Sequence, residues 1–205
     1  MTSSRPTAAA RPGPVSLRRR GPVLERAILD AALEQLSTVG WGGLTMEGVA
    51  AGARTGKAAV YRRWPSKEDL VADALRAGLP ALEDAPDHGG IREDLYDVCR
   101  RVRDAMLSEP GLALRSVLHE CDVRTAERFQ TVIVGGMIEP SIALFREVIS
   151  RGVARGEVRA DAMSGMVFDV IPAMMMYRSK VCGSEWPDDE IAQMIDQVMV
   201  PLFRA

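Results

Sequence analysis

Residues 44–70 read LTMEGVAAGARTGKAAVYRRWPSKEDL, and this stretch predicts two short helices joined by a tight turn. The second helix is expected to begin near Gly56 and to end at Trp64, because Pro65 disfavours the α conformation in the residue before it. Val60 lies four positions before Trp64, so the two side chains share the buried face of that helix. The stretch therefore predicts a helix-turn-helix, the unit with which many proteins read duplex DNA.

The first helix of the pair has its own start signal. Thr45 can cap it, since a threonine side chain at this position accepts a hydrogen bond from an amide of the first turn. Its inward residues Val49, Ala50 and Ala53 are small enough to let a second helix cross closely. The region before it, from Pro22 to Gly40, predicts a further helix with an apolar stripe at helical spacing.

The outward side of the second helix combines cations, a phenol and small residues that allow close approach to a groove. Thr45, Tyr61 and Lys67 are predicted to contact phosphates, with Lys57 and its small neighbours at base edges. The full set of predicted DNA-binding residues is Thr45, Arg54, Thr55, Gly56, Lys57, Ala58, Ala59, Tyr61, Arg62 and Lys67.

The segment ends in the pattern Tyr-x-x-aromatic-Pro-Ser-Lys-Glu, which is formed by Tyr61, Trp64 and residues 65–68. In this it closely resembles the DNA-binding domain of the tetracycline-repressor (TetR) family of bacterial transcription regulators. The resemblance extends back through Trp41 and the preceding helix. It implies a ligand-responsive repressor whose central helices enclose a small-molecule pocket. It also implies a homodimer formed by the last two helices.

One position departs from the family pattern. Glycine is usual near the end of the turn between the two helices, but in this chain Ala50 is followed by Ala51, Gly52, Ala53 and then Arg54. Either Arg54 adopts a left-handed conformation at some energetic cost, or the turn is shifted towards Gly52. Arg54 could in addition contact a phosphate.

The chain is predicted to be all-α, with three parts. Residues 1–21 are rich in Pro, Gly, Ser, Thr and Arg and predict a flexible basic arm that either reaches a minor groove or only aids solubility. Residues 22–68 form the predicted helix-turn-helix domain. Residues 69–205 carry helical apolar stripes throughout and predict a larger helical bundle for ligand binding and dimerisation.

Charge follows this division. Residues 1–70 have a net charge of +5, whereas residues 71–205 have a net charge of −7. Chance variation along the chain is one explanation, but the positive part coincides with the predicted helix-turn-helix. The pattern favours duplex DNA as the partner of the first part and discourages nonspecific wrapping of DNA around the rest.

Several other classes of function find little support. The three cysteines Cys99, Cys121 and Cys182 lack metal or disulfide spacing, which favours a reducing cytoplasmic setting, with a thiol redox sensor as the alternative. Neither a metal nor a cofactor is expected, and no segment is apolar enough to cross a membrane. The sequence has no GxSxG elbow or phosphate-binding glycine loop, so we expect no enzyme.

Nine of the eleven methionines follow residue 100, and three of them are consecutive at 174–176. Consecutive positions point around most of a helix, so these side chains fill the core, line a cavity or face a second subunit. The candidate ligand-binding residues, chosen by position and chemistry, are Cys99, Met106, Met137, Phe168 and Met175. The rival to a ligand-responsive repressor is a helical small-molecule-binding or interaction protein that retains a non-regulatory helix-turn-helix.

Overall fold

The computed structural model describes residues 21–120, 122–162 and 165–204, and every regular element among them is helical. This confirms the all-α prediction. The predicted arm lies outside the described residues except for Gly21, which begins the first helix. The elements are α1 (Gly21–Gly43), α2 (Met46–Gly52), α3 (Lys57–Tyr61), α4 (Lys67–Gly78), α5 (Ile91–Leu107), α6 (Glu109–Glu120), α7 (Val123–Ile133), the π-helical η1 (Val134–Ile138), α8 (Glu139–Ala154), the 3₁₀-helical η2 (Ala160–Ala162), α9 (Gly165–Val181), α10 (Asp188–Met194), the π-helical η3 (Ile195–Met199) and α11 (Val200–Phe203).

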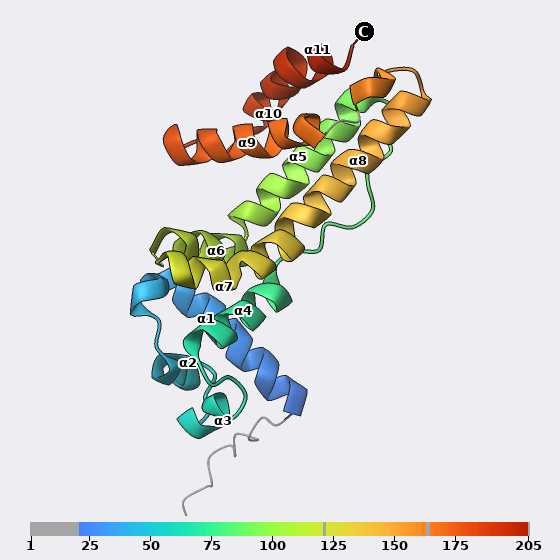
Figure 1. The fold of residues 1–205 in the computed structure, drawn as a ribbon. Helices are drawn as coiled ribbons and strands as arrows, with labels where there is room; N and C mark the ends of the chain where they lie inside the picture. The colour runs from blue at the N-terminus through green and yellow to red at the C-terminus, as the bar shows by residue number, and fades with distance from the viewer. Residues whose placement is uncertain (1–20, 121, 163–164, 205) are drawn as a thin grey trace, which may run out of the picture.

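The molecule is elongated, with α1 to α4 at one end and α9 to α11 at the other (Figure 1). The long helices α5 and α8 lie side by side along the second half and pack on one another. Helices α6 and α7 lie between the two ends, and α6 packs extensively on α1. No helix among the described residues has both the length and the apolar character that a membrane span requires.

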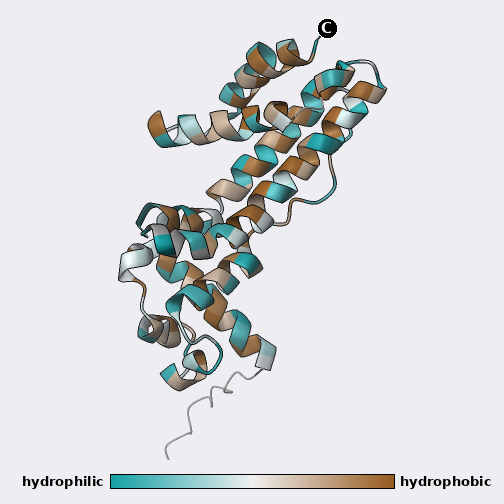
Figure 2. Ribbon diagram, in the orientation of Figure 1, coloured by the Kyte–Doolittle hydropathy of each residue, from teal (hydrophilic) through white to brown (hydrophobic). Residues whose placement is uncertain are grey.

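Two hydrophobic cores account for this shape. The first joins α1 to α4 with α6 and α7, and its fully buried members include Ile28, Val49 and Val60. The second joins α5, α8, α9 and the C-terminal helices, and includes Leu95 and Ile195. Because α6 and α7 contribute to the first core, the N-terminal helices share their packing with the larger bundle. Figure 2 shows apolar and polar residues mixed along most helices, as expected where one side of a helix is buried.

One apolar stripe does not form a continuous buried face. Helical spacing predicts a shared buried face for Val134, Ile138, Ile142, Phe145 and Ile149. In the structure, Ile138 is 41% exposed. The reason is the π-helical η1, whose extra residue per turn changes the phase of the helix just before Pro140. Pro140 lacks an amide hydrogen and its ring clashes with the carbonyl four residues earlier, which explains the wider turn. The same arrangement recurs where η3 precedes Pro201.

Helix α5 carries two buried carboxylates. Asp94 is fully buried and accepts hydrogen bonds from the His88 amide (2.6 Å) and the Arg155 guanidinium (3.2 Å). Burial alone would raise the pKa of Asp97, but hydrogen bonds from Arg101, Arg100 and His88 together outweigh it and lower the pKa to about 2. Asp97 therefore remains charged at neutral pH. The contacts of the two carboxylates tie the segment before α5 to the bundle.

Candidate nucleic-acid interface

Helix α2 begins as the sequence predicts. The Thr45 hydroxyl accepts a hydrogen bond from the Gly48 amide at 3.1 Å, which caps the helix. Val49 and Ala50 are buried on its inner side, where α3 packs against it. Thr45 itself is exposed, so its hydroxyl hydrogen remains available to a phosphate oxygen.

The turn between α2 and α3 adopts the first of the two predicted alternatives. Arg54 has φ of +54°, in the left-handed region. The Thr55 amide donates to the Ala50 carbonyl at 2.9 Å and the Arg54 amide donates to the Ala51 carbonyl at 3.0 Å. This pair of bonds is the Schellman motif that commonly ends a helix. The sequence therefore forces an arginine into a conformation that glycine adopts at lower cost.

Helix α3 divides into a buried and an exposed face. Val60 is fully buried and Trp64, just beyond the helix, is 4% exposed, as their spacing predicts. The Trp64 indole donates to the Asp73 carboxylate of α4 at 2.9 Å, which fixes the end of the α3 segment. On the other face Lys57, Ala58, Tyr61 and Arg62 are exposed. The structure thus places four of the predicted contact residues on one solvent-facing surface.

Lys57 has two neighbours on this surface. Its ammonium forms an ion pair with the Glu47 carboxylate of α2 and lies 5.3 Å from the centre of the Tyr61 ring. The hydrogen bond between the Lys57 ammonium and the Glu47 carboxylate lowers the pKa of Glu47 and raises the pKa of Lys57. Sequence analysis did not single out Glu47. Its position ten residues before Lys57, across the turn, was the available signal.

Lys67 lies apart from these side chains. Its ammonium donates to the Trp41 carbonyl and, at 3.4 Å, to the Leu44 carbonyl, and it lies 4.0 Å from the centre of the Trp41 ring. Burial lowers its pKa. Lys67 therefore links the start of α4 to residues 41–44, the segment formed by the end of α1 and the residue after it.

That segment is also held from the larger bundle. The Ser116 hydroxyl of α6 accepts from the Trp41 amide at 3.2 Å, and the Glu120 carboxylate accepts from the Gly42 amide at 2.9 Å. The Trp41 ring packs edge-on against Phe129 of α7, with ring centres 5.4 Å apart. Sequence analysis missed these contacts because they join residues distant in the chain.

Gly40 makes the close approach of α6 possible. It has φ of +72°, and a Cβ atom at this position would lie 2.5 Å from a Glu120 carboxylate oxygen. The predicted end of α1 at Gly40 agrees with this break in helical geometry, although one further turn follows it.

The predicted ligand-binding residues lie in two different places. Cys99, Phe168 and Met175 are buried in the second core and Met106 packs against it, whereas Met137 packs against the first core. Met106 and Met175 both line a void of about 10 Å³ between α5, α6 and α9, which Trp186 also lines. Burial raises the pKa of the Cys99 thiol to about 12, so it is protonated at neutral pH.

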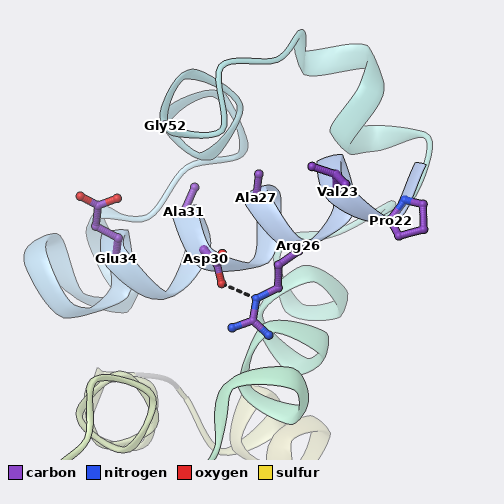
Figure 3. Close-up of a pocket in the computed structure, with 8 residues that line it drawn as sticks. All are labelled: Pro22, Val23, Arg26, Ala27, Asp30, Ala31, Glu34 and Gly52. Atoms are coloured by element: carbon purple, nitrogen blue, oxygen red, sulfur yellow. Dashed lines mark hydrogen bonds and ion pairs between the residues drawn. The ribbon is translucent and has the colours of Figure 1, made fainter. Parts of the chain in front are cut away.

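An open groove runs along the outer side of α1 (Figure 3). It lies beside Gly52 at the end of α2, and Arg26 and Asp30 at its side form an ion pair of 2.8 Å. None of the predicted ligand-binding residues lines it. Its lining residues are Pro22, Val23, Arg26, Ala27, Asp30, Ala31, Glu34 and Gly52. Within the described ranges, no group of three His, Cys, Asp or Glu side chains is placed to hold a metal ion.

Known proteins share both halves of this arrangement. Residues 28–74 match the family model of bacterial regulatory proteins of the tetR family, and residues 85–198 match a tetracyclin repressor-like C-terminal domain. The DNA-binding transcriptional repressor TetR of Mycobacteroides abscessus is 32% identical over 189 residues, covering 90% of this chain and 96% of the relative. An uncharacterized HTH-type transcriptional regulator of Mycobacterium bovis is 31% identical over 181 residues, covering 86% of each chain.

The fold is shared with solved structures as well. The crystal structure of a TetR-family regulator from Mesorhizobium loti superposes with a TM-score of 0.65 at 16% identity, covering 87% of this chain and 94% of that one. These matches span both the helix-turn-helix and the helical bundle. The chain belongs to the TetR family of DNA-binding transcriptional regulators.

Proposed function

We propose that this protein is a cytoplasmic repressor that binds a near-palindromic operator as a homodimer and releases it when a small molecule binds the larger bundle. The exposed face of α3 is the observation that carries the proposal. It presents Lys57, Tyr61 and Arg62 to solvent, while the opposite face packs into the first core. Such a helix fits the major groove with its cations directed to base edges and phosphates.

The proposed contacts follow from the positions of the side chains. Lys57, Gly56 and Ala58 face base edges, and Thr45, Tyr61 and Arg62 face phosphates. Ala59, also predicted at a base edge, is partly buried and packs against the first core. Arg54 and Thr55, in the turn before α3, add contacts at one end of the reading surface. The rival class, an interaction protein with a non-regulatory helix-turn-helix, requires no DNA binding at all.

Titration of DNA that flanks the gene with purified protein at several salt concentrations separates the two classes. A regulator should bind one such fragment at least about 1,000-fold more tightly than unrelated DNA, with an affinity that falls linearly on a log–log plot against salt. If the protein does not bind DNA, or binds all DNA with equal affinity, an interaction protein with a non-regulatory helix-turn-helix explains the chain better than a regulator.

The proposed dimer face lies on α9. Its buried side chains Val167, Phe168, Ile171 and Met175 point into the subunit, and its opposite face is apolar and exposed. Exposed or partly exposed residues there recur at helical spacing, namely Met166, Val170, Ala173, Tyr177 and Val181. A second copy of the chain is the partner we propose for this face.

The apolar residues of the C-terminal helices pack within the subunit. Ile191, Ile195 and Met199 are fully buried, and α10 and η3 pack against α5. The interface first assigned to both of the last two helices is therefore proposed to centre on α9 alone.

Effector binding requires the second core to open. The void beside Met106 and Met175 is too small for an organic molecule, so a ligand there must separate α5 from α9. Movement of the adjacent α6 would reach the reading helices through Ser116 and Glu120, which hold the end of α1 just before α2. A coupling of about 5- to 150-fold in operator affinity is typical of such switches. A ligand that raises the melting temperature but leaves operator affinity unchanged would contradict this scheme.

Replacing Arg54 by glycine should stabilise the fold and weaken DNA binding. Glycine relieves the left-handed strain, worth about 1 kcal/mol, which raises the melting temperature by about 2–4 °C. Loss of the cation should lower the salt slope by about one. Arg54→Ala is the control, because it removes the charge and keeps the strain. A melting temperature that rises equally in both variants would show that the conformation is not the cause.

Replacing Lys67 by methionine should lower both stability and DNA affinity. The variant loses the charge-assisted hydrogen bonds to the end of α1 and to Leu44, at a cost of about 1–3 kcal/mol. Thermal melting and salt titration of DNA binding check this. Lys57→Met is the control for stability alone, since its ion pair is exposed and contributes little to folding. If Lys67→Met melts like the wild type and only the salt slope falls, Lys67 is a phosphate contact alone.

A further inference from the structure

The surface that carries the exposed face of α3 contains one carboxylate beside its central cation. Glu47, in the first turn of α2, pairs with Lys57, and both side chains are more than half exposed. The other predicted contacts on this surface are cationic or neutral. A lone carboxylate facing the phosphates of duplex DNA is repelled by them, so its presence calls for an explanation.

The simpler explanation is that the negative charge of Glu47 interacts favourably with the positive N-terminal end of the α2 dipole. Acidic residues are common in the first turn of a helix. Thr45, however, already caps this helix, and besides its own amide the Glu47 carboxylate binds Lys57 on the neighbouring helix. The cross-helix pairing therefore needs a reason beyond the stability of α2.

We propose that Glu47 and Lys57 act together as a specificity pair that reads a G·C base pair in each half-site. This inference rests on the proposed operator binding. In the major groove guanine presents the acceptors O6 and N7, and its paired cytosine presents the N4 amino donor. The Lys57 ammonium can donate to O6 and N7 of guanine while the neighbouring Glu47 carboxylate accepts from the N4 amino group of cytosine. Each charge therefore gains a hydrogen-bond partner on the base pair when the two side chains separate from one another.

The same pair disfavours other sequences. On a site without this pattern, Lys57 must leave Glu47 to contact a phosphate, and the carboxylate then remains unpaired close to the backbone. The cation of Lys57 is thus withheld from nonspecific binding, which depends on phosphate contacts alone. Glu47 is therefore expected to raise the affinity for the operator and to lower the affinity for nonspecific DNA.

Selection of half-sites from a randomised duplex pool, followed by affinity and salt titrations, tests the proposal. Wild-type protein should enrich G·C at one position in each half-site. Glu47→Ala and Glu47→Gln should relax that position and bind the selected operator about 5- to 100-fold more weakly. Both should bind unrelated DNA about fivefold more tightly, with a salt slope about one unit steeper.

Glu83→Gln serves as the matched control for charge, because Glu83 is exposed in the segment between α4 and α5. It should leave base preference and both affinities unchanged. Melting temperatures close to that of the wild type will show that the Glu47 variants are folded.

The outcomes separate this inference from the function on which it rests. If the wild type selects no sequence, operator binding and the specificity pair both fail. If the wild type selects a half-site and both Glu47 variants select the same bases with the same ratio of operator to nonspecific affinity, the specificity pair alone is overturned.

Discussion

Replacement of Ala173 by glutamate is expected to convert the dimer into monomers and to abolish tight operator binding. Ala173 lies in the middle of the exposed apolar face of α9, between Val170 and Tyr177. Burying an unpaired carboxylate in an interface costs about 3–5 kcal/mol, which is equivalent to a loss of about 100-fold or more in the dimerisation constant. A twofold interface contains two such charges, so the loss should be larger still.

The fold of the subunit should survive this change, because the Ala173 side chain points to solvent. Sedimentation equilibrium would measure the mass, and titration with operator DNA would measure the affinity. The same substitution at the exposed Ala160, which lies outside α9, is the control and should leave both unchanged. If Ala173→Glu dimerises with the same dissociation constant as the wild type, the dimer interface does not include this face of α9.

Replacement of Asp94 by alanine is expected to cause a large loss of stability. The carboxylate is fully buried, and its removal leaves the His88 amide and the Arg155 guanidinium without this acceptor. Hydrogen bonds to a charged group contribute about 1.5–3 kcal/mol each, so we expect a loss of about 3 kcal/mol in the free energy of unfolding, which for a chain of this length lowers the melting temperature by about 6–12 °C.

Asp196→Ala provides the matched comparison. Asp196 accepts two hydrogen bonds from Arg92, at 2.6 and 2.8 Å, but both side chains are nearly half exposed. An exposed pair of this kind contributes little to stability, because solvent screens the two charges. Denaturant titration of the two variants should therefore separate them clearly. Equal losses would mean that burial of Asp94 does not make it critical.

Local sequence signals predicted the DNA-binding end of the molecule well. The cap at Thr45, the buried pair Val60 and Trp64, and the helix break at Gly40 each depend on residues within a few positions of one another. Such signals are readable because helix geometry fixes which nearby side chains meet. The outward face of α3 follows from the same periodicity.

Contacts between distant residues could not be read in this way. The binding of Lys67 to the Trp41 carbonyl depends on how α4 packs against α1, and the contacts of Ser116 and Glu120 depend on the position of α6. Residue type predicted Lys67 as a phosphate contact and gave no sign of these carbonyl contacts. Ordinary helical periodicity also failed at Ile138, because a π-helical turn before Pro140 changes the phase of the helix.

The larger bundle shows a second limit. Cys99, Met106, Phe168 and Met175, all predicted to bind a ligand, lie in or against one core, but chemistry alone could not show that this core is closely packed in the structure. Met137 joins the other core because the helix that carries it lies nearer to α4 and α7. A pocket for an effector depends on a change in helix packing, which a pattern of apolar residues does not encode.

The central claim is that two copies of α3 enter successive major grooves of one operator. Footprinting of the bound operator tests it most directly, with the number of subunits per duplex measured on the same complex. The account predicts two subunits and two protected half-sites whose centres lie about 34–36 Å apart along the duplex, or a multiple of that spacing, with protection lost in Lys57→Ala. A single protected half-site bound by one subunit, or full protection by Lys57→Ala, would contradict it.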